Sequence, residues 1–194
     1  MAATAVEAWD ERWATPEGRA DWWLVPHPAV AAVVPVLKAR GTRRVLDLGC
    51  GVGRHALLFA EHAFAVEAVD GAAAGLDFAS REVAARGLRP VCARPMPMPC
   101  PLPTKASDYV LSRNVIYHGT MGDVGRRLAE IWRILRPGGW TKARCCRSAM
   151  HNSPAAGRSP STPSFAAATP TRTRTIIATW PVLPRSSPAS CFCR

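Results

Sequence analysis

The sequence contains no long uninterrupted apolar stretch and no recognisable secretory leader. Its longest apolar stretch, residues 29–37, is interrupted by Pro35 and falls well short of the ~20 residues that a membrane-spanning helix needs. Residues 1–10 carry neither a basic segment nor a long apolar core, so we expect no signal peptide. These absences predict a cytoplasmic protein without a membrane segment.

The cysteines form neither an even set nor a metal-binding pattern. There are seven of them, scattered along the chain, and an odd number without a secretory leader favours reduced thiols. Cys145 and Cys146 are adjacent, and Cys191 and Cys193 are separated by one residue, which are not the spacings of a zinc site. We therefore expect no metal.

Acidic residues are missing from the C-terminal part of the chain. Residues 141–194 hold 8 Lys and Arg and no acid, whereas residues 1–140 hold 17 Lys and Arg against 14 Asp and Glu. Most of the net charge of +11 therefore lies in the last segment and says little about the rest of the chain. Trp180 and Phe192 are not interleaved with its arginines, so we do not expect a nucleic-acid partner.

The sequence does contain a glycine-rich turn between a short apolar run and a helix. Residues 43–48 are mostly apolar, as in a parallel strand covered on both faces, and Gly49, Gly51 and Gly53 follow at alternate positions. Glycine accepts positive φ and has no Cβ, so a ligand can lie against the backbone of such a turn. The helix that begins near Arg54 would direct its first amides at that ligand.

Two carboxylates and one missing glycine indicate which ligand this is. Asp70 ends a second expected strand, and its two oxygens suit the hydroxyl groups of a ribose. Arg54 stands where a dinucleotide-binding turn has its third glycine, whereas Asp47 suits a cationic sulfonium with an amino-acid tail. The turn could also be a plain strand–helix loop, but the glycines, Asp47 and Asp70 together favour S-adenosylmethionine.

Three stretches of the chain resemble the class I S-adenosylmethionine-dependent methyltransferases. Residues 45–53 (VLDLGCGVG) are similar to the first motif of that family, and residues 108–119 (DYVLSRNVIYHG) to its fourth strand and the following loop. Residues 128–139 (LAEIWRILRPGG) are similar to the helix and turn before its fifth strand. The resemblance covers residues 9–140, and it is nearest to small bacterial methyltransferases that include the tellurite-resistance type.

The resemblance implies a cofactor, S-adenosylmethionine, a small-molecule acceptor and a set of binding residues. It places Asp47, Gly49, Cys50 and Gly51 around the methionine part of the cofactor, Asp70 and Gly71 at its ribose, and Asn114 and Val115 on the opposite side. Tyr117 and His118 are the only nearby candidates for acid–base catalysis, which is needed only where the acceptor must lose a proton. His55 is expected to pack or to face solvent.

The expected fold is α/β, a Rossmann-like, doubly wound and mostly parallel sheet. Residues 1–140 would form the cofactor-binding domain, and its first 40 residues would be cap helices. A segment over residues 6–23 would be a capping helix or a lid, because Trp9 and Trp13 share one helix face. We expect further helices over residues 29–40, 72–86 and 124–135, one beginning near Arg54, and strands over 43–48, 64–70, 88–93 and 108–112.

Two segments depart from the resemblance. Residues 94–103 have proline at every second position and predict an extended loop, and no acid occurs between Glu82 and Asp108, where the family carries one near the adenine. Residues 141–194 predict a basic tail that is disordered or poorly packed, with the C-terminal strands missing or disordered. Only residues 175–183 could form a short strand there, and Pro181 interrupts it. Shifted reading frames would explain both departures, and the sequence of the coding DNA would decide this. The alternatives to a small-molecule methyltransferase are a cofactor-binding remnant without turnover and a nucleic-acid methyltransferase that uses the tail.

Overall fold

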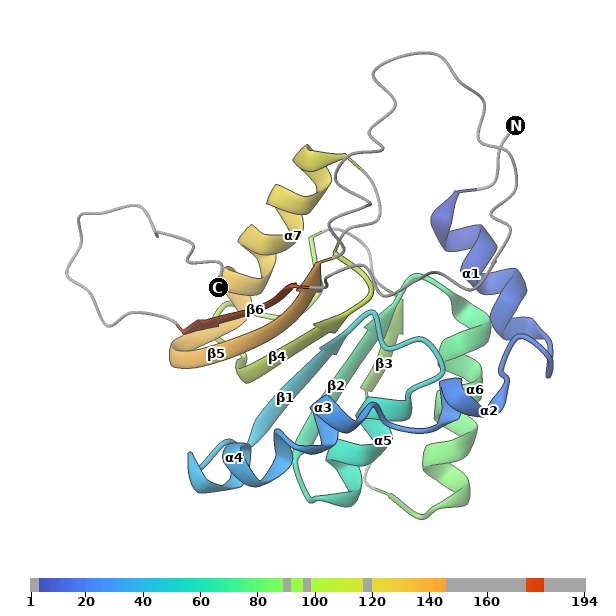
Figure 1. The fold of residues 1–194 in the computed structure, drawn as a ribbon, viewed down its shortest axis with the longest axis horizontal. Helices are drawn as coiled ribbons and strands as arrows, with labels where there is room; N and C mark the ends of the chain where they lie inside the picture. The colour runs from blue at the N-terminus through green and yellow to red at the C-terminus, as the bar shows by residue number, and fades with distance from the viewer. Residues whose placement is uncertain (1–3, 89–91, 96–98, 117–119, 146–173, 180–194) are drawn as a thin grey trace.

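The computed structural model describes residues 4–88, 92–95, 99–116, 120–145 and 174–179. Its centre is a six-stranded sheet in the order β3-β2-β1-β4-β5-β6 (Figure 1). The strands are β1 Arg44–Leu48, β2 Ala65–Asp70, β3 Cys92–Pro95, β4 Ser107–Arg113, β5 Leu135–Cys145 and β6 Arg174–Thr179. β1 to β5 pair in parallel and β6 lies antiparallel to β5, which confirms the predicted mostly parallel α/β sheet.

Helices connect these strands and precede the first of them. They are α1 Ala5–Ala14, α2 Asp21–Leu24, α3 Pro28–Ala31, α4 Val34–Ala39, α5 Arg54–Glu61, α6 Ala73–Ala85 and α7 Met121–Ile134. The strands and helices predicted between residues 43 and 86 and around residues 108–135 are confirmed, with ends shifted by a few residues. Such shifts are ordinary at element boundaries.

The residues of β1 alternate between two cores on opposite faces of the sheet. Val45 packs in a cluster with Phe59 of α5 and residues of α3 and α4. Leu46 packs in a second cluster with Ile131 and Ile134 of α7. Figure 1 shows α7 on one side of the sheet and α3 to α5 on the other, so β1 is covered on both faces as its apolar sequence predicts.

The single helix predicted over residues 29–40 is wrong, because two short helices, α3 and α4, occupy that segment. The break lies between the end of α3 and the start of α4, and Pro35 is in the first turn of α4. Proline has no amide hydrogen and its ring clashes with the carbonyl four residues earlier, so one helix cannot run through it. The same residue is favourable in the first turn of a new helix.

The third strand lies slightly later than predicted. β3 is Cys92–Pro95, so the first residues of the expected proline-rich loop belong to a strand. β3 is the edge strand beside β2, and edge strands tolerate proline. Residues 89–91 and 96–98 lie outside the described residues.

The expectation that the C-terminal strands are missing or disordered is corrected, and the one short strand that the sequence allowed, over residues 175–183, overlaps β6. β5 continues past Trp140 to Cys145, and β6 pairs with it from Arg174 to Thr179. Thr141 is buried in β5 and donates a hydrogen bond from Oγ1 to the Val110 carbonyl, 2.8 Å away. Four of the six residues of β6 are β-branched, and such residues favour a strand even where the sequence shows no apolar periodicity. The rest of the predicted tail, residues 146–173 and 180–194, lies outside the described residues.

Candidate functional site

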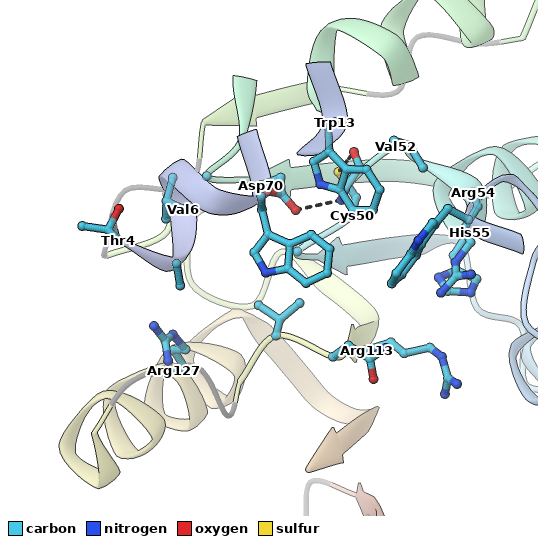
Figure 2. Close-up of a pocket in the computed structure, with 18 residues that line it drawn as sticks. Thr4, Val6, Trp13, Cys50, Val52, Arg54, His55, Asp70, Arg113 and Arg127 are labelled. Atoms are coloured by element: carbon cyan, nitrogen blue, oxygen red, sulfur yellow. Dashed lines mark hydrogen bonds between the residues drawn. The ribbon is translucent and has the colours of Figure 1, made fainter. Parts of the chain in front are cut away.

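A cavity of about 320 Å³ lies at the carboxyl ends of β1, β2 and β4. This edge is where open α/β sheets bind ligands. Its lining residues are Thr4, Ala5, Val6, Trp9, Trp13, Trp23, Gly49, Cys50, Gly51, Val52, Arg54, His55, Asp70, Gly71, Arg113, Asn114, Val115 and Arg127. Figure 2 shows these side chains converging from the N-terminal helix, the glycine turn and the loop after β4.

One side of the cavity is the glycine turn after β1, which we call the glycine wall (residues 49–53). Gly49 has φ +76° and lies so close to Val115 that any Cβ at this position would overlap the valine side chain. The amides of Gly49 and Cys50 donate hydrogen bonds to the Val69 carbonyl, at 2.7 and 3.1 Å. The turn is therefore fixed between the end of β2 and the loop after β4, and its backbone faces the cavity.

Asp70, the last residue of β2, links that turn to the start of α6. Its Oδ2 accepts a hydrogen bond from the Gly51 amide at 2.7 Å, and its Oδ1 accepts one from the Ala72 amide at 2.9 Å. Burial raises the pKa of the carboxyl group, and the backbone hydrogen bonds oppose this rise. Each carboxylate oxygen can accept a further hydrogen bond, so the group can still hold a pair of hydroxyls in the cavity.

Asp47 lies near the cavity but does not line it. Its side chain is 1% exposed and accepts a hydrogen bond from the amide of Ala56 in the first turn of α5, while its Oδ2 has no hydrogen-bond partner. Burial raises the pKa of Asp47 to about 7; the Asp70 charge adds to the rise and Arg54 opposes it. Asp47 would therefore act on a ligand through its charge, from beneath the turn, rather than by direct contact.

Next to the glycine wall, the cavity is lined by a cluster of three aromatic residues, the tryptophan wall (Trp9, Trp13 and Trp23). Trp9 stacks on Trp13 with ring centroids 5.1 Å apart, and Trp23 meets both rings edge-on. Asp10 accepts a hydrogen bond from the Ala74 amide at 2.8 Å and so fixes α1 to the start of α6. The N-terminal segment thus packs against the start of α6 and also lines the cavity.

Arg54 and His55 begin α5 and are held from two sides. Arg54 donates a hydrogen bond to the Trp22 carbonyl at 2.8 Å, and its guanidinium carbon lies 5.1 Å from the Trp23 ring centroid. His55 is buried, and its Nε2 accepts a hydrogen bond from the His27 amide at 3.2 Å. Burial and then the neighbouring cations lower the pKa of His55 to about 3, so this imidazole is neutral and packs as expected.

The structure brings most of the predicted site together. The predicted residues that line the cavity are Gly49, Cys50, Gly51, Asp70, Gly71, Asn114 and Val115. Tyr117 and His118, the candidates for acid–base catalysis, lie outside the described residues. The sequence reasoning missed three lining arginines, Arg54, Arg113 and Arg127, because arginine is common along this chain and nothing in its spacing marks these positions.

Within the described ranges, no helix is both long enough and apolar enough to cross a membrane. The same residues contain no group of three or more His, Cys, Asp or Glu side chains arranged to hold a metal ion. Cys50 and Cys100 are buried and form no disulfide bond.

Comparison with known protein families matches residues 45–139 to the methyltransferase domain family. The matched residues run from β1 to the turn within β5, so they include the glycine wall and the loop after β4. A comparison with curated protein sequences found no match.

Many solved structures are similar to this chain. One was solved in work on the conversion of a disulfide bond into a thioacetal group during echinomycin biosynthesis. It is 25% identical, with a TM-score of 0.54, and the match covers 62% of this chain and 50% of that one. TehB from Haemophilus influenzae is 20% identical, with a TM-score of 0.53 over 61% of this chain and 40% of that one. Geranyl diphosphate C-methyltransferase from Streptomyces coelicolor A3(2), solved with S-adenosyl-L-homocysteine, is 22% identical, with a TM-score of 0.50 over 59% and 45%. The chain therefore covers 50% of the first of these proteins, 40% of the second and 45% of the third.

Proposed function

Because residues 45–139 match the methyltransferase domain family, we propose that this chain is a class I S-adenosylmethionine-dependent methyltransferase and transfers a methyl group from S-adenosylmethionine to a small-molecule acceptor. One observation carries the proposal. Seven of the eight residues that the glycine-turn motif and its resemblance assigned to the cofactor line a single cavity at the carboxyl edge of the sheet. These residues come from the three loops that follow β1, β2 and β4, at the edge where open α/β sheets bind ligands.

The residues of the cavity fit this cofactor. The absence of a Cβ at Gly49 lets Val115 pack directly against the turn, so the turn and the loop after β4 meet at the edge of the cavity. Asp70 is placed to accept hydrogen bonds from ribose hydroxyls, and Asp47 and Asp70 bring two carboxyl groups close to a ligand that carries a positive sulfur. S-adenosylmethionine supplies, when bound, a methyl group on a sulfonium that a nucleophile can attack.

The described side chains act by positioning and by excluding water. His55 is the one imidazole among the described residues that line the cavity, and its Nε2 already accepts a hydrogen bond while its pKa is near 3. It therefore cannot serve as a general base at neutral pH. The protein's main contribution would be to align the acceptor with the methyl group that the bound cofactor supplies.

A second candidate is cofactor binding without turnover. It is favoured by the missing acid between Glu82 and Asp108, where the family has an acidic residue near the adenine. The two candidates differ in one measurable respect, because both bind the cofactor but only the first releases S-adenosylhomocysteine in the presence of an acceptor.

Calorimetric titration of the full chain with S-adenosylhomocysteine tests the cofactor assignment. We expect saturable binding to the native chain and at least tenfold weaker binding to Asp70→Asn, because a hydrogen bond to a charged group is worth about 1.5–3 kcal/mol. Asp77→Asn makes the same change on the exposed side of α6 and should leave the affinity unchanged. A folded native chain that does not bind S-adenosylhomocysteine would overturn the proposal. Transfer of a labelled methyl group to small molecules of a cell extract then separates an enzyme from a remnant.

A further inference from the structure

Two acidic side chains lie at the glycine wall, and the structure holds them in different ways. Asp70 lines the cavity, and each of its carboxylate oxygens accepts a backbone hydrogen bond, from the Gly51 and Ala72 amides. Asp47 lies beneath the turn and is 1% exposed. It accepts a hydrogen bond from the Ala56 amide, but its Oδ2 has no partner. Backbone hydrogen bonds stabilise a buried carboxylate, so Asp70 is the better stabilised anion of the two.

The charges that act on Asp47 do not compensate its own. Burial and then the charge of Asp70 raise the pKa of Asp47 to about 7, and Arg54 opposes this rise. Arg54 donates a hydrogen bond of 2.8 Å to the Trp22 carbonyl and lies over the Trp23 ring, so it acts on Asp47 by its charge rather than through that hydrogen bond. At neutral pH, Asp47 is therefore divided between its protonated and its ionised form.

Three further titratable groups lie on the elements packed around Asp47, and all three are neutral near pH 7. Burial raises the pKa of Cys50 in the turn and of Tyr109 on β4, and the charge of Asp47 adds to both rises. Burial and then the neighbouring cations lower the pKa of His55 on α5 to about 3. Arginine side chains keep their charge throughout the working range of pH. Cys50 lines the cavity beside Asp70 (Figure 2), so the charge of Asp47 reaches a ligand there as well.

The proposed cofactor and its product differ in the property to which a buried carboxyl group responds. S-adenosylmethionine and S-adenosylhomocysteine share their adenine, ribose and amino-acid parts, so the hydrogen bonds that the glycine wall and Asp70 can make are common to both. They differ by one methyl group and by the positive charge on the sulfur. A single methyl group gives weak discrimination, whereas a charge close to a buried carboxylate interacts strongly because little water screens it.

We propose that Asp47 makes this site distinguish the cationic cofactor from its neutral product, an inference that rests on the proposed function above. Asp47 releases its proton to solvent when S-adenosylmethionine binds, because the positive sulfur then balances the carboxylate charge. Its protonation is unchanged when S-adenosylhomocysteine binds, because the thioether sulfur carries no charge. After methyl transfer, Asp47 takes a proton back from solvent. The site therefore favours fresh cofactor over product, most strongly where Asp47 is ionised.

Calorimetric titration of the full chain with both ligands at several pH values tests this role. The measured quantity is the ratio of the two dissociation constants, in which an effect of Asp70 on the shared ribose cancels. We expect the preference for S-adenosylmethionine to increase about fivefold from pH 5.5 to 7.5, because binding of the cation no longer has to remove a proton from Asp47 at the higher pH. Asp47→Asn should reduce this increase to about twofold or less. Asp77→Asn makes the same change on the exposed side of α6 and should keep it.

Proton release gives a second readout that a purely structural role of Asp47 would not produce. Titrations at pH 7 in two buffers of different ionisation enthalpy count the protons that leave the protein on binding. With S-adenosylmethionine, the native chain should release about 0.4 proton more than Asp47→Asn does. With S-adenosylhomocysteine, the two chains should release the same number.

Three outcomes would overturn the role of Asp47. They are a ratio that does not change with pH in the native chain, an increase that persists in Asp47→Asn, and equal proton release by the two chains with S-adenosylmethionine. If Asp47→Asn does not fold, the native chain decides alone, and the proposal fails unless S-adenosylmethionine releases more protons than S-adenosylhomocysteine does. Failure of the proposed function itself looks different, because then neither ligand binds at any pH.

Discussion

The two walls of the cavity enclose the same space by different means. The glycine wall is backbone, fixed by amide hydrogen bonds to Val69 and Asp70 and by a position where no side chain fits against Val115. The tryptophan wall is side chain, three large rings that pack on one another and lie over the turn. A Cβ built on Gly51 would already lie 3.4 Å from the Trp13 ring, so the two walls are in contact.

This difference separates what is general in the site from what is particular to the chain. A backbone wall can serve any ligand with the same nucleoside and amino-acid parts, because it offers amides and space rather than shape. A side-chain wall offers shape, and each ring can be exchanged without moving the sheet. The glycine wall is therefore the part of the site that carries the proposed cofactor assignment, and the tryptophan wall is the part that is particular to this chain.

Removing the central ring of the tryptophan wall should have the largest effect. Trp13 is 4% exposed and contacts both partner rings, so Trp13→Ala should lower the free energy of unfolding by about 3–5 kcal/mol. Trp22→Ala changes a ring that is 65% exposed and should cost no more than about 0.5 kcal/mol. Urea unfolding followed by circular dichroism measures both, and equal losses in the two variants would show that the wall does not contribute to the folded core.

Adding a methyl group to the glycine wall should have a somewhat smaller effect. Gly49→Ala combines the cost of a left-handed backbone, about 1–2 kcal/mol, with overpacking against Val115 of about 1–3 kcal/mol. Gly41→Ala is the matched control, since Gly41 has φ +68° with open space around it and bears only the backbone cost. If unfolding measurements give the same loss for both, the contact with Val115 does not restrict the turn.

The glycine wall was also the part that the sequence predicted well. Its strand, turn, helix and second strand follow each other within residues 44–70, and local periodicity and glycine spacing are enough to place them. Seven of the predicted binding residues lie where parallel strands end together, which is a consequence of the topology. Asp47 was the exception, because sequence order does not show that its side chain turns under the loop towards α5.

The tryptophan wall and the C-terminal strands were harder to predict. The spacing of Trp9 and Trp13 indicates a shared helix face, but the third ring comes from another helix, and only the folded chain brings Trp23 to them. Residues 141–145 and 174–179 are paired because β4 offers an edge to β5 and β5 offers one to β6, not because their own sequence is periodic. Tertiary pairing of this kind overrides weak local preferences.

The carboxyl group beneath the glycine wall predicts a pH dependence of smaller size. The pKa of Asp47 is raised to about 7 in the native chain and is near 3.8 in the unfolded chain, so between these values only the native state holds the proton. Stability from this group therefore falls as pH rises, by about 2 kcal/mol between pH 5 and 6.5, and the fall stops above pH 7.

Asp47→Asn isolates this contribution. His55 has the opposite sign, because its lowered pKa makes stability rise with pH over the same interval, so the native chain alone shows a sum of the two. The variant should gain about 2 kcal/mol relative to the native chain from pH 5 to 6.5, measured by urea unfolding at each pH. A constant difference between Asp47→Asn and the native chain across this interval would mean that Asp47 titrates as an ordinary carboxyl group.

The smallest effect is expected at the start of the tryptophan wall, where α1 has a capping box. Thr4 accepts a hydrogen bond from the Glu7 amide, and Glu7 accepts one from the Thr4 amide, at 3.3 and 2.6 Å. Thr4→Ala should cost about 1 kcal/mol and raise hydrogen exchange in α1 selectively. Thr120→Ala removes the equivalent box of α7, formed with Asp123, and should cost a similar amount while leaving exchange in α1 unchanged. If both variants raise exchange in α1 equally, α1 does not open as a separate unit. The tryptophan wall would then be as firmly tied to the rest of the fold as the glycine wall is.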